Sequence, residues 1–244
     1  MTLCIAVKCS DGVLLACDSK TVYGRGVPIS RETNKIHILE KKGIINHKVA
    51  IMGAGVVAFI DKFIRMFRDE DIEKSAKEVG KDSLTLSEVI NKIAEPMASV
   101  IYDEYVKRRE FKEEEISFDL VMGGFEAENS PDAFILYGRG LAEPIDDFGV
   151  IGSGSAYADL FLRYLLPHSV EERDIKSIIK PICYTIRLVE TIDPFVGGRI
   201  NLVAVTSKGT IENMSNQAID LPKDNANEAL QSAMNILKEV LDRR

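Results

Sequence analysis

The chain begins with two short apolar runs, residues 2–9 and 13–20, separated by the turn-like segment 10–12. Apolar runs of this length on either side of a turn containing Gly are typical of a β-hairpin. If three residues form the loop, with the Gly in a left-handed bulge, the charged residues collect on one face of the hairpin and the other face stays apolar. We therefore expect a three-residue loop, which would place Asp18 on the same face as Thr2, one pair away along the ladder.

Further along the chain, blocks of predicted strands alternate with predicted helices. Apolar residues spaced three and four apart predict helices, and shorter apolar runs bounded by turns predict strands. Ser83 or Thr85 would cap the second helix, and Pro96 would kink it. Strands are expected at 35–40, 48–53, 117–125, 133–139, 147–151, 199–206 and 210–214, and helices at about 57–67, 86–109, 155–166, 171–190 and 224–242.

The order of these elements predicts an α+β fold. Pairs of helices between blocks of antiparallel strands suggest two sheets packed face to face, with helices covering both outer faces. No linker, low-complexity tract or internal repeat interrupts the pattern, so we expect a single domain over residues 1–244.

Composition and charge narrow the range of functions. The chain has 244 residues, of which 45% are hydrophobic and 28% charged, as in an ordinary soluble protein with a sizeable core. Its net charge is −7 and it has no basic stripe, which argues against a nucleic-acid partner. No apolar run is long enough to span a bilayer, and the N-terminus lacks the features of a secretory signal. We expect a cytoplasmic protein without a membrane partner.

The sequence gives no sign of a metal or cofactor site. Its cysteines do not follow the spacing of metal ligands, and its three histidines are scattered along the chain. We therefore expect no metal and no cofactor, and free buried thiols in a reducing cytosol. The cysteines are Cys4, Cys9, Cys17 and Cys183, and the histidines are His37, His47 and His168.

Short motifs occur in a characteristic order along most of the chain. Each motif alone is common and has an ordinary structural explanation, such as a turn, a strand-end charge or a helix N-cap. The ordered set resembles proteasome β-subunits and their bacterial relatives, which are N-terminal-nucleophile (Ntn) hydrolases. The motifs are Met1–Val7, Asp11–Asp18, Lys35-Ile36, Val49–Gly55, Gly152–Ser155, and Asp193 followed by Gly197-Gly198.

The resemblance implies a threonine-type endopeptidase on a four-layer αββα sandwich. Its nucleophile would be Thr2, exposed by removal of Met1 without a long propeptide. Lysine and aspartate beside the nucleophile, an oxyanion-hole amide, and a supporting serine and second aspartate complete the family's site. These roles fall on Lys35, Asp18, Gly53, Ser153 and Asp193, in that order.

The chemistry of peptide cleavage explains why these residue types belong together. A threonine hydroxyl needs an adjacent base, and a free α-amino group, with a reference pKa of about 8, can serve as that base. A Lys35 ammonium held in place by Asp18 would lower the pKa values of the amine and the hydroxyl of Thr2. The amide of Gly53 would stabilise the oxyanion, a contribution of about 3–4 kcal/mol in other enzymes. Attack would give an ester acyl-enzyme that water then hydrolyses.

The chain departs from the family pattern in ways that keep other functions open. Leu3 and Val196 stand where small or hydroxyl residues are usual, and the interval between Asp18 and Lys35 is about one residue longer. A non-catalytic structural subunit is one alternative, and an amidase or transpeptidase on the same fold is another. The retention of Thr2 with Asp18 and Lys35 favours the peptidase.

Partners follow from the resemblance alone. It implies a polypeptide substrate, a ring formed by self-association or with related proteasome subunits, and an ATP-dependent unfoldase that supplies substrates. Ile51 is the one residue that we expect to line the substrate pocket beside Thr2.

Overall fold

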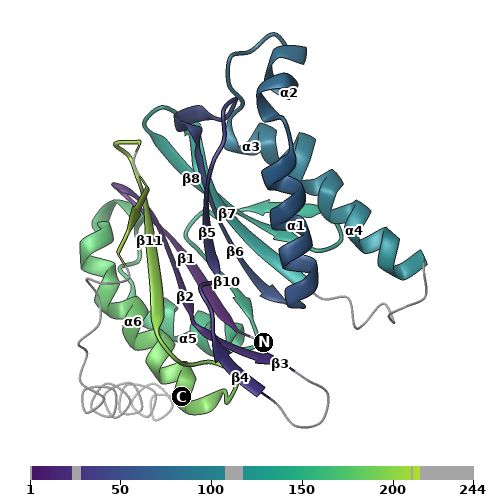
Figure 1. The fold of residues 1–244 in the computed structure, drawn as a ribbon. Coiled ribbons are helices and arrows are strands. Elements are labelled where there is room, and N and C mark those ends of the chain that lie inside the picture. The colour runs from purple at the N-terminus through teal and green to yellow at the C-terminus, as the bar shows by residue number, and fades with distance from the viewer. Residues whose placement is uncertain (1, 24–28, 108–117, 210, 215–244) are drawn as a thin grey trace.

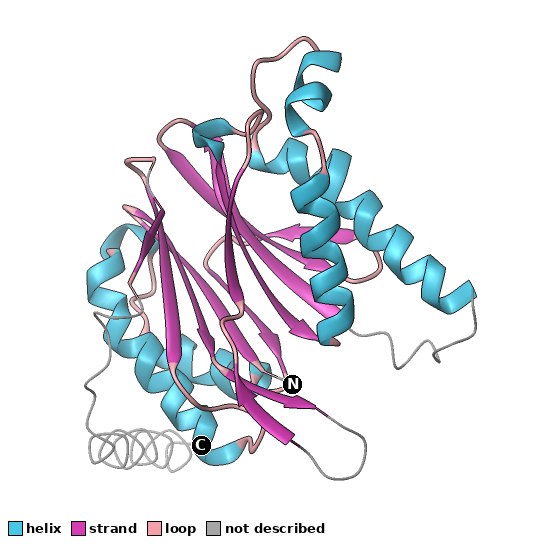
Figure 2. Cartoon of the chain, viewed as in Figure 1, coloured by secondary structure: helices cyan, strands magenta, loops and turns pink. Residues whose placement is uncertain are grey.

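Two five-stranded antiparallel sheets face each other, and helices cover the outer face of each sheet (Figures 1 and 2). This computed structural model describes all residues except 1, 24–28, 108–117, 210 and 215–244. The helix expected at 224–242 therefore lies outside the described residues. The four layers confirm the predicted α+β sandwich.

The N-terminal strand lies inside the first sheet, between two partners. The sheet has the strand order β10-β1-β2-β11-β12, and helices α5 and α6 pack on its outer face. A 3₁₀ turn at Val170–Glu172 precedes α6. The bounds are β1 Leu3–Cys9, β2 Gly12–Asp18, β10 Phe148–Gly152, β11 Ile200–Thr206, β12 Ile211–Asn213, α5 Ser155–Leu165 and α6 Ile175–Ile192.

The second sheet has the order β5-β6-β7-β8-β9 and is covered by the helices between β6 and β7. A small separate pair, β3-β4, links the two sheets along the chain. A 3₁₀ turn at Ile45–His47 joins β5 to β6. The bounds are β3 Lys20–Tyr23, β4 Ile29–Glu32, β5 Ile36–Glu40, β6 Lys48–Gly55, β7 Phe118–Ala127, β8 Ser130–Tyr137, β9 Leu141–Pro144, α1 Val57–Asp69, α2 Ile72–Glu78, α3 Leu86–Val89 and α4 Glu95–Lys107.

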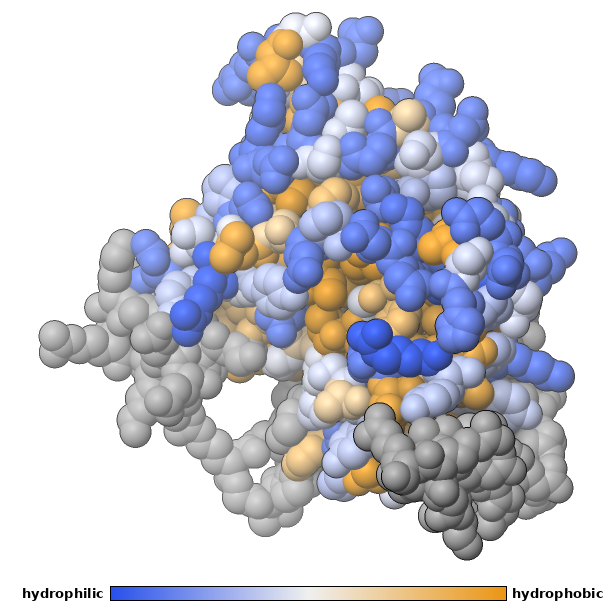
Figure 3. Space-filling view, turned by 180° about the vertical axis from the view of Figure 1, so that it is seen from behind, coloured by the Kyte–Doolittle hydropathy of each residue, from blue (hydrophilic) through white to orange (hydrophobic). Residues whose placement is uncertain are grey.

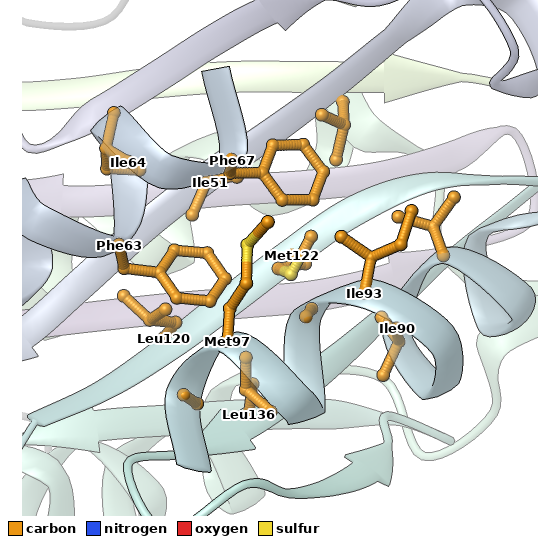
Figure 4. Close-up of a cluster of buried hydrophobic side chains, with 14 of the residues drawn as sticks. Ile51, Phe63, Ile64, Phe67, Ile90, Ile93, Met97, Leu120, Met122 and Leu136 are labelled. Atoms are coloured by element: carbon orange, nitrogen blue, oxygen red, sulfur yellow. The ribbon is translucent and has the colours of Figure 1, made fainter. Parts of the chain in front are cut away.

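Three apolar layers hold the sandwich together. On β1, Leu3 and Ile5 pack beneath α5 and α6, whereas Cys4 and Ala6 face the other sheet. Successive side chains of a strand point to opposite faces, so a strand inside the sandwich must be apolar on both. The third layer lies between the second sheet and α1, α3 and α4 (Figure 4).

The first hairpin has a two-residue turn, Ser10-Asp11, because Cys9 pairs directly with Gly12. The expected three-residue loop is therefore wrong. The expectation assumed one apolar and one polar face, but both faces of this hairpin are covered and apolar. Gly12 is needed for a different reason: a Cβ there would lie 2.2 Å from the carbonyl oxygen of Val205 on β11.

The helix expected at 86–109 is interrupted by a π-helical segment, Ile90–Ala94, between α3 and α4. Thr85 is its N-cap and forms a capping box with Glu88. The π segment ends just before Pro96, which lacks an N–H and whose ring would crowd the preceding turn of a regular α-helix. A π turn is one of the ways in which a helix accommodates such a disturbance.

We predict that Gly43→Ala destabilises the protein more than Gly80→Ala. Both glycines have left-handed φ angles, +80° and +74°, so an alanine at either position has similar backbone strain of about 1–2 kcal/mol. At Gly43 the new Cβ would also lie 2.5 Å from the backbone of Glu73, whereas at Gly80 no atom of the described residues lies within 4 Å. Urea unfolding should show an additional loss of roughly 1–3 kcal/mol for Gly43→Ala. Equal losses would contradict the packing of α2 against this turn.

Candidate active site

The carboxylate of Asp18, at the end of β2, lies at the centre of a buried polar cluster. Its Oδ1 accepts hydrogen bonds from the hydroxyl of Thr2 at 2.5 Å, the ammonium of Lys35 at 2.8 Å and the backbone N–H of Leu3 at 2.9 Å. The Lys35 ammonium also donates to the Thr2 hydroxyl. Thr2, Asp18 and Lys35 are therefore in mutual contact, as the resemblance implied.

The second carboxylate oxygen of Asp18 is held by backbone groups. Its Oδ2 accepts from the N–H groups of Lys20 and Gly197, both at 3.1 Å. Asp18 is fully buried, so each of these bonds replaces water that the ionised carboxylate has lost. Sequence reasoning missed Gly197 as a partner of Asp18, although its Gly-Gly motif was part of the family pattern.

Asp18 reaches Thr2 from an unexpected direction. In the observed register Asp18 lies on the face of Leu3, not on the face of Thr2. Thr2 precedes the first residue of β1, where the chain no longer follows the alternation of the strand. Thr2 and Asp18 are therefore neighbours, as expected, but they make contact at the end of the strand and not across a shared face of the hairpin.

Lys35 lies just before β5 and has only 9% of its side chain exposed. Besides Thr2 and Asp18, its ammonium donates to the carbonyl oxygen of Lys20 at 2.6 Å. These three acceptors use all three N–H bonds of a lysine ammonium. The charge of Lys35 is thus paired with Asp18, and the ammonium is oriented by groups from the first sheet and from β3.

The segment 152–153, at the end of β10, approaches the backbone of Thr2. The hydroxyl of Ser153 donates to the carbonyl oxygen of Thr2 over 3.5 Å, a long hydrogen bond. Gly152 has a left-handed φ of +106°, and a Cβ there would lie 2.1 Å from the same carbonyl oxygen. Ser153 and the glycine before it therefore position Thr2 through its backbone.

Asp193 does not contact Thr2 among the interactions that the structure describes. It ends α6 as the C-cap, and its carboxylate accepts from the N–H of Phe195 at 2.8 Å. The turn that it stabilises brings the N–H of Gly197 to Asp18. Val196 within this turn is buried in the apolar layer under α5 and α6 and supplies no hydroxyl.

A pocket of about 200 Å³ opens beside Thr2. Pockets that enclose drug-sized ligands are larger, roughly 300–1,000 Å³, so this pocket suits a single side chain. Gly53 forms part of its wall, where a Cβ would collide with Leu120 and Ile60. The complete lining is Thr2, Thr21, Thr33, Asn34, Lys35, His37, Gly53, Gly55, Val57, Ile60 and Asp61.

Ile51 does not line this pocket, so that expectation is wrong. It lies two residues deeper in β6 than Gly53, on the same face of the strand, and is fully buried. Figure 4 shows Ile51 beneath α1, beside Phe67. Gly53, in contrast, lines the pocket.

Two groups near the site have altered pKa values. Burial lowers the pKa of His37 below its usual 6.5, and Arg68 lowers it further, while Asp61 acts in the opposite direction. The hydrogen-bonding contact with Cys17, together with burial, raises the pKa of the Cys4 thiol well above its usual value. Cys4 donates to the carbonyl oxygen of Gly53 at 3.6 Å and remains a thiol, which is not the nucleophilic form of cysteine.

A family model described as the proteasome subunit matches residues 2–205. The chain belongs to the proteasome-subunit family. The same fold recurs in solved structures of proteins called Anbu. The Anbu Gly-1 mutant from Hyphomicrobium sp. strain MC1 is 14% identical, with a TM-score of 0.73 over 98% of this chain and 97% of that one. Anbu from Yersinia bercovieri, titled an ancestral β-subunit, is 15% identical, with a TM-score of 0.68 over 96% of each chain.

A third structure, a helical assembly of the Anbu complex from Pseudomonas aeruginosa, is 15% identical, with a TM-score of 0.68 over 99% of this chain and 96% of that one. Among proteins of curated function, no match was found. At these identities the neighbours establish the shared proteasome-type Ntn fold. In the described residues there is no cluster of metal-ligating side chains, and none of their helices is long and apolar enough to cross a membrane.

We predict that Asp18→Asn lowers the free energy of unfolding by about 3–5 kcal/mol, because it leaves the Lys35 ammonium buried without a counter-ion. In a double-mutant cycle with Lys35→Met, the combined loss should be smaller than the sum of the single losses by roughly 0.5–3 kcal/mol. Urea unfolding measures all three variants. As a control, the exposed pair Glu73 and Lys77, 2.6 Å apart, should show much weaker coupling in the same cycle. Strict additivity at Asp18 and Lys35 would contradict the contact.

We also predict a pH-dependent stability contribution from His37. Since its pKa is lowered in the folded protein, the unfolded chain binds more protons between that pKa and about 6.5. Stability should therefore fall as the pH drops through this interval, and the loss should be absent in His37→Gln. Unfolding free energies of both proteins at several pH values between about 7.5 and 5 test this. A difference between the two proteins that does not change with pH would overturn it.

Proposed function

We propose that this protein is a threonine-type endopeptidase in which Thr2, freed of Met1, is the nucleophile. The observation that carries the proposal is the contact of the Thr2 hydroxyl with both the Lys35 ammonium and the Asp18 carboxylate, beside an open pocket. Thr2 has only 3% of its surface exposed, yet it lines the pocket. Its hydroxyl is therefore placed to react with a group bound in the pocket, and not simply to be solvated. Membership of the proteasome-subunit family supports the same assignment.

The proposed reaction begins with the Thr2 hydroxyl giving its proton to the free α-amino group of the same residue. The oxygen forms a bond to the carbonyl carbon of the peptide, and the Lys35 ammonium stabilises the negative charge as it develops. The amide of Gly53 is proposed to donate to the oxyanion. The carbon–nitrogen bond then breaks, the amine leaves with the proton, and water hydrolyses the remaining ester.

Leu3 is compatible with this activity. Its side chain is buried under α5 and α6, and it contributes to the site only through its backbone N–H, which binds Asp18. Any residue other than proline supplies that N–H. Leu3, in place of the small residue usual in the family, therefore changes the packing beneath the site and not the groups that face a substrate.

Val196 favours a second candidate function, a structural subunit without activity. Its side chain is buried against the loop that carries Ser153, where a Cβ on Gly154 would lie 3.1 Å from it. A valine there offers no hydrogen bond to the free amine of Thr2. The peptidase requires that the amine of Thr2 be oriented without a hydroxyl at position 196, and the structural subunit does not.

We propose further that the protein self-associates. Helix α5 exposes several large hydrophobic side chains, and hydrophobic residues reach the surface among hydrophilic ones on the face seen in Figure 3. The Pseudomonas aeruginosa relative is titled a helical assembly. Repeated contacts between identical subunits give either a closed ring or an open helical filament. Light scattering at micromolar concentration tests the idea, and a monomer would contradict it. The exposed residues of α5 are Tyr157, Leu160, Tyr164 and Leu165.

A cytoplasmic location, a polypeptide substrate and an ATP-dependent unfoldase belong to the same proposal. They rest on the family and on the need to deliver an extended chain to a buried nucleophile. Co-purification of an ATPase with the tagged protein from its own cells would support the partnership, and its absence under ATP-bound conditions would count against it.

Intact-mass spectrometry tests the central claim. We expect the purified protein to lack Met1 and to gain one stable adduct with a peptide epoxyketone, a reagent that needs both a hydroxyl and a free α-amine. Thr2→Ala should gain none, whereas Thr191→Ala, which alters a threonine outside the pocket, should react like the unmodified protein. A chain that keeps Met1, or that loses it and never reacts, would favour the structural subunit.

A further inference from the structure

The walls of the pocket beside Thr2 are suited to the stem of a long side chain. Gly53 and Gly55, at the end of β6, line it without side chains of their own, and Val57 and Ile60 of α1 provide apolar contact. Asp61 lies one helical turn after Val57 on the same side of α1 and also lines the pocket. An apolar wall next to an acidic group matches the chemistry of lysine and arginine, which have apolar stems and charged ends.

The cationic group already in the pocket cannot bind an acidic substrate. All three N–H bonds of the Lys35 ammonium are directed at Thr2, Asp18 and Lys20, and its charge is balanced by that of Asp18. The hydroxyls of Thr21 and Thr33 bond to each other at 2.6 Å. A substrate carboxylate would find no charged donor among these groups.

Asp61, in contrast, has its charge available. It is exposed, and it forms no hydrogen bond or ion pair within the described part of the chain. Burial keeps the nearby His37 neutral at pH 7.5, so this residue does not offset the charge of Asp61. The pocket therefore carries an unbalanced negative charge.

We propose that this pocket selects a lysine or arginine side chain, and that Asp61 is the residue that determines this specificity. The inference rests on the proposed function, because the pocket is taken to hold the side chain next to the bond that Thr2 attacks. The carbon chain of the substrate contacts Val57 and Ile60, and its cationic end pairs with Asp61.

One feature of α1 acts in the opposite direction. The helix begins at Val57, and its N-terminus carries a partial positive charge, with no acidic residue in the first turn and no side-chain cap. That partial charge is about half a unit, against the full charge of Asp61, and it declines within one turn. The balance favours a cation, and an acidic substrate is the alternative that the test must exclude.

Peptides that differ only in the residue before the cleaved bond provide the test. At pH 7.5, kcat/KM should be higher for Arg and Lys than for Leu, and lowest for Glu. Asp61→Asn should reduce the ratio of Arg to Leu about tenfold, as expected for the loss of a partly exposed charge-assisted contact. Asp61→Lys should reverse the preference between Arg and Glu. Asp69→Asn removes the same charge from the far end of α1, outside the pocket, and should leave the ratios unchanged.

The possible outcomes separate this inference from the proposed function. Cleavage with a preference for Leu or Glu, or an Arg preference that persists in Asp61→Asn, would overturn the role of Asp61 while the peptidase stands. If no peptide is cleaved, the role of Asp61 is tested by peptide binding instead. Titration of the Arg and Leu peptides into Thr2→Ala, followed through the NMR signals of His37, should show tighter binding of the Arg peptide, and this difference should vanish when Asp61→Asn is added. Equal binding of the two peptides would overturn the inference.

Discussion

The buried carboxylate of Asp18 is the group on which the rest of the site depends. A fully buried negative charge is tolerated only when it is paired and hydrogen-bonded, and five donors meet this requirement: Thr2, Lys35, and the backbone N–H groups of Leu3, Lys20 and Gly197. These donors come from the ends of strands and from the turn after α6. Satisfying one charge therefore fixes the relative positions of segments that are far apart in the sequence.

The double sandwich explains how such a charge can be buried beside the hydroxyl of Thr2. β1 and β2 are covered on one face by α5 and α6 and on the other by the second sheet, so water is excluded from the interior of the hairpin. Only at the ends of the strands does the packing open. There a pocket opens that is lined by Thr2, Gly53 and Gly55. The same packing thus surrounds the Asp18 cluster with low-polarity groups and leaves Thr2 accessible from the pocket.

Backbone groups supply many of the contacts around Asp18 and Lys35. Leu3 contributes an N–H, Lys20 an N–H and a carbonyl oxygen, and Gly197 an N–H. The contacts of Leu3 and Lys20 do not involve their side chains, whereas Gly197 has a φ of +153° that favours glycine. The proposed specificity, in contrast, rests on side chains of α1 that line the pocket, because Val57, Ile60 and Asp61 are not among the groups that hydrogen-bond to Asp18.

The sequence predicted the order of the major elements, because long apolar periodicities such as those of α1 and α6 report burial directly. It also identified Thr2, Asp18 and Lys35, through motifs in family order. It missed the short elements β3, β4, β9 and α2, whose few residues carry too weak a pattern. The folded structure was needed to establish the register of the first hairpin, since covering both faces removes the polarity that would distinguish one register from another. It alone showed that Ile51 is core, that Asp193 acts through a turn, and that Asp61 faces the pocket, because each depends on which strand end or helix turn packs beside it.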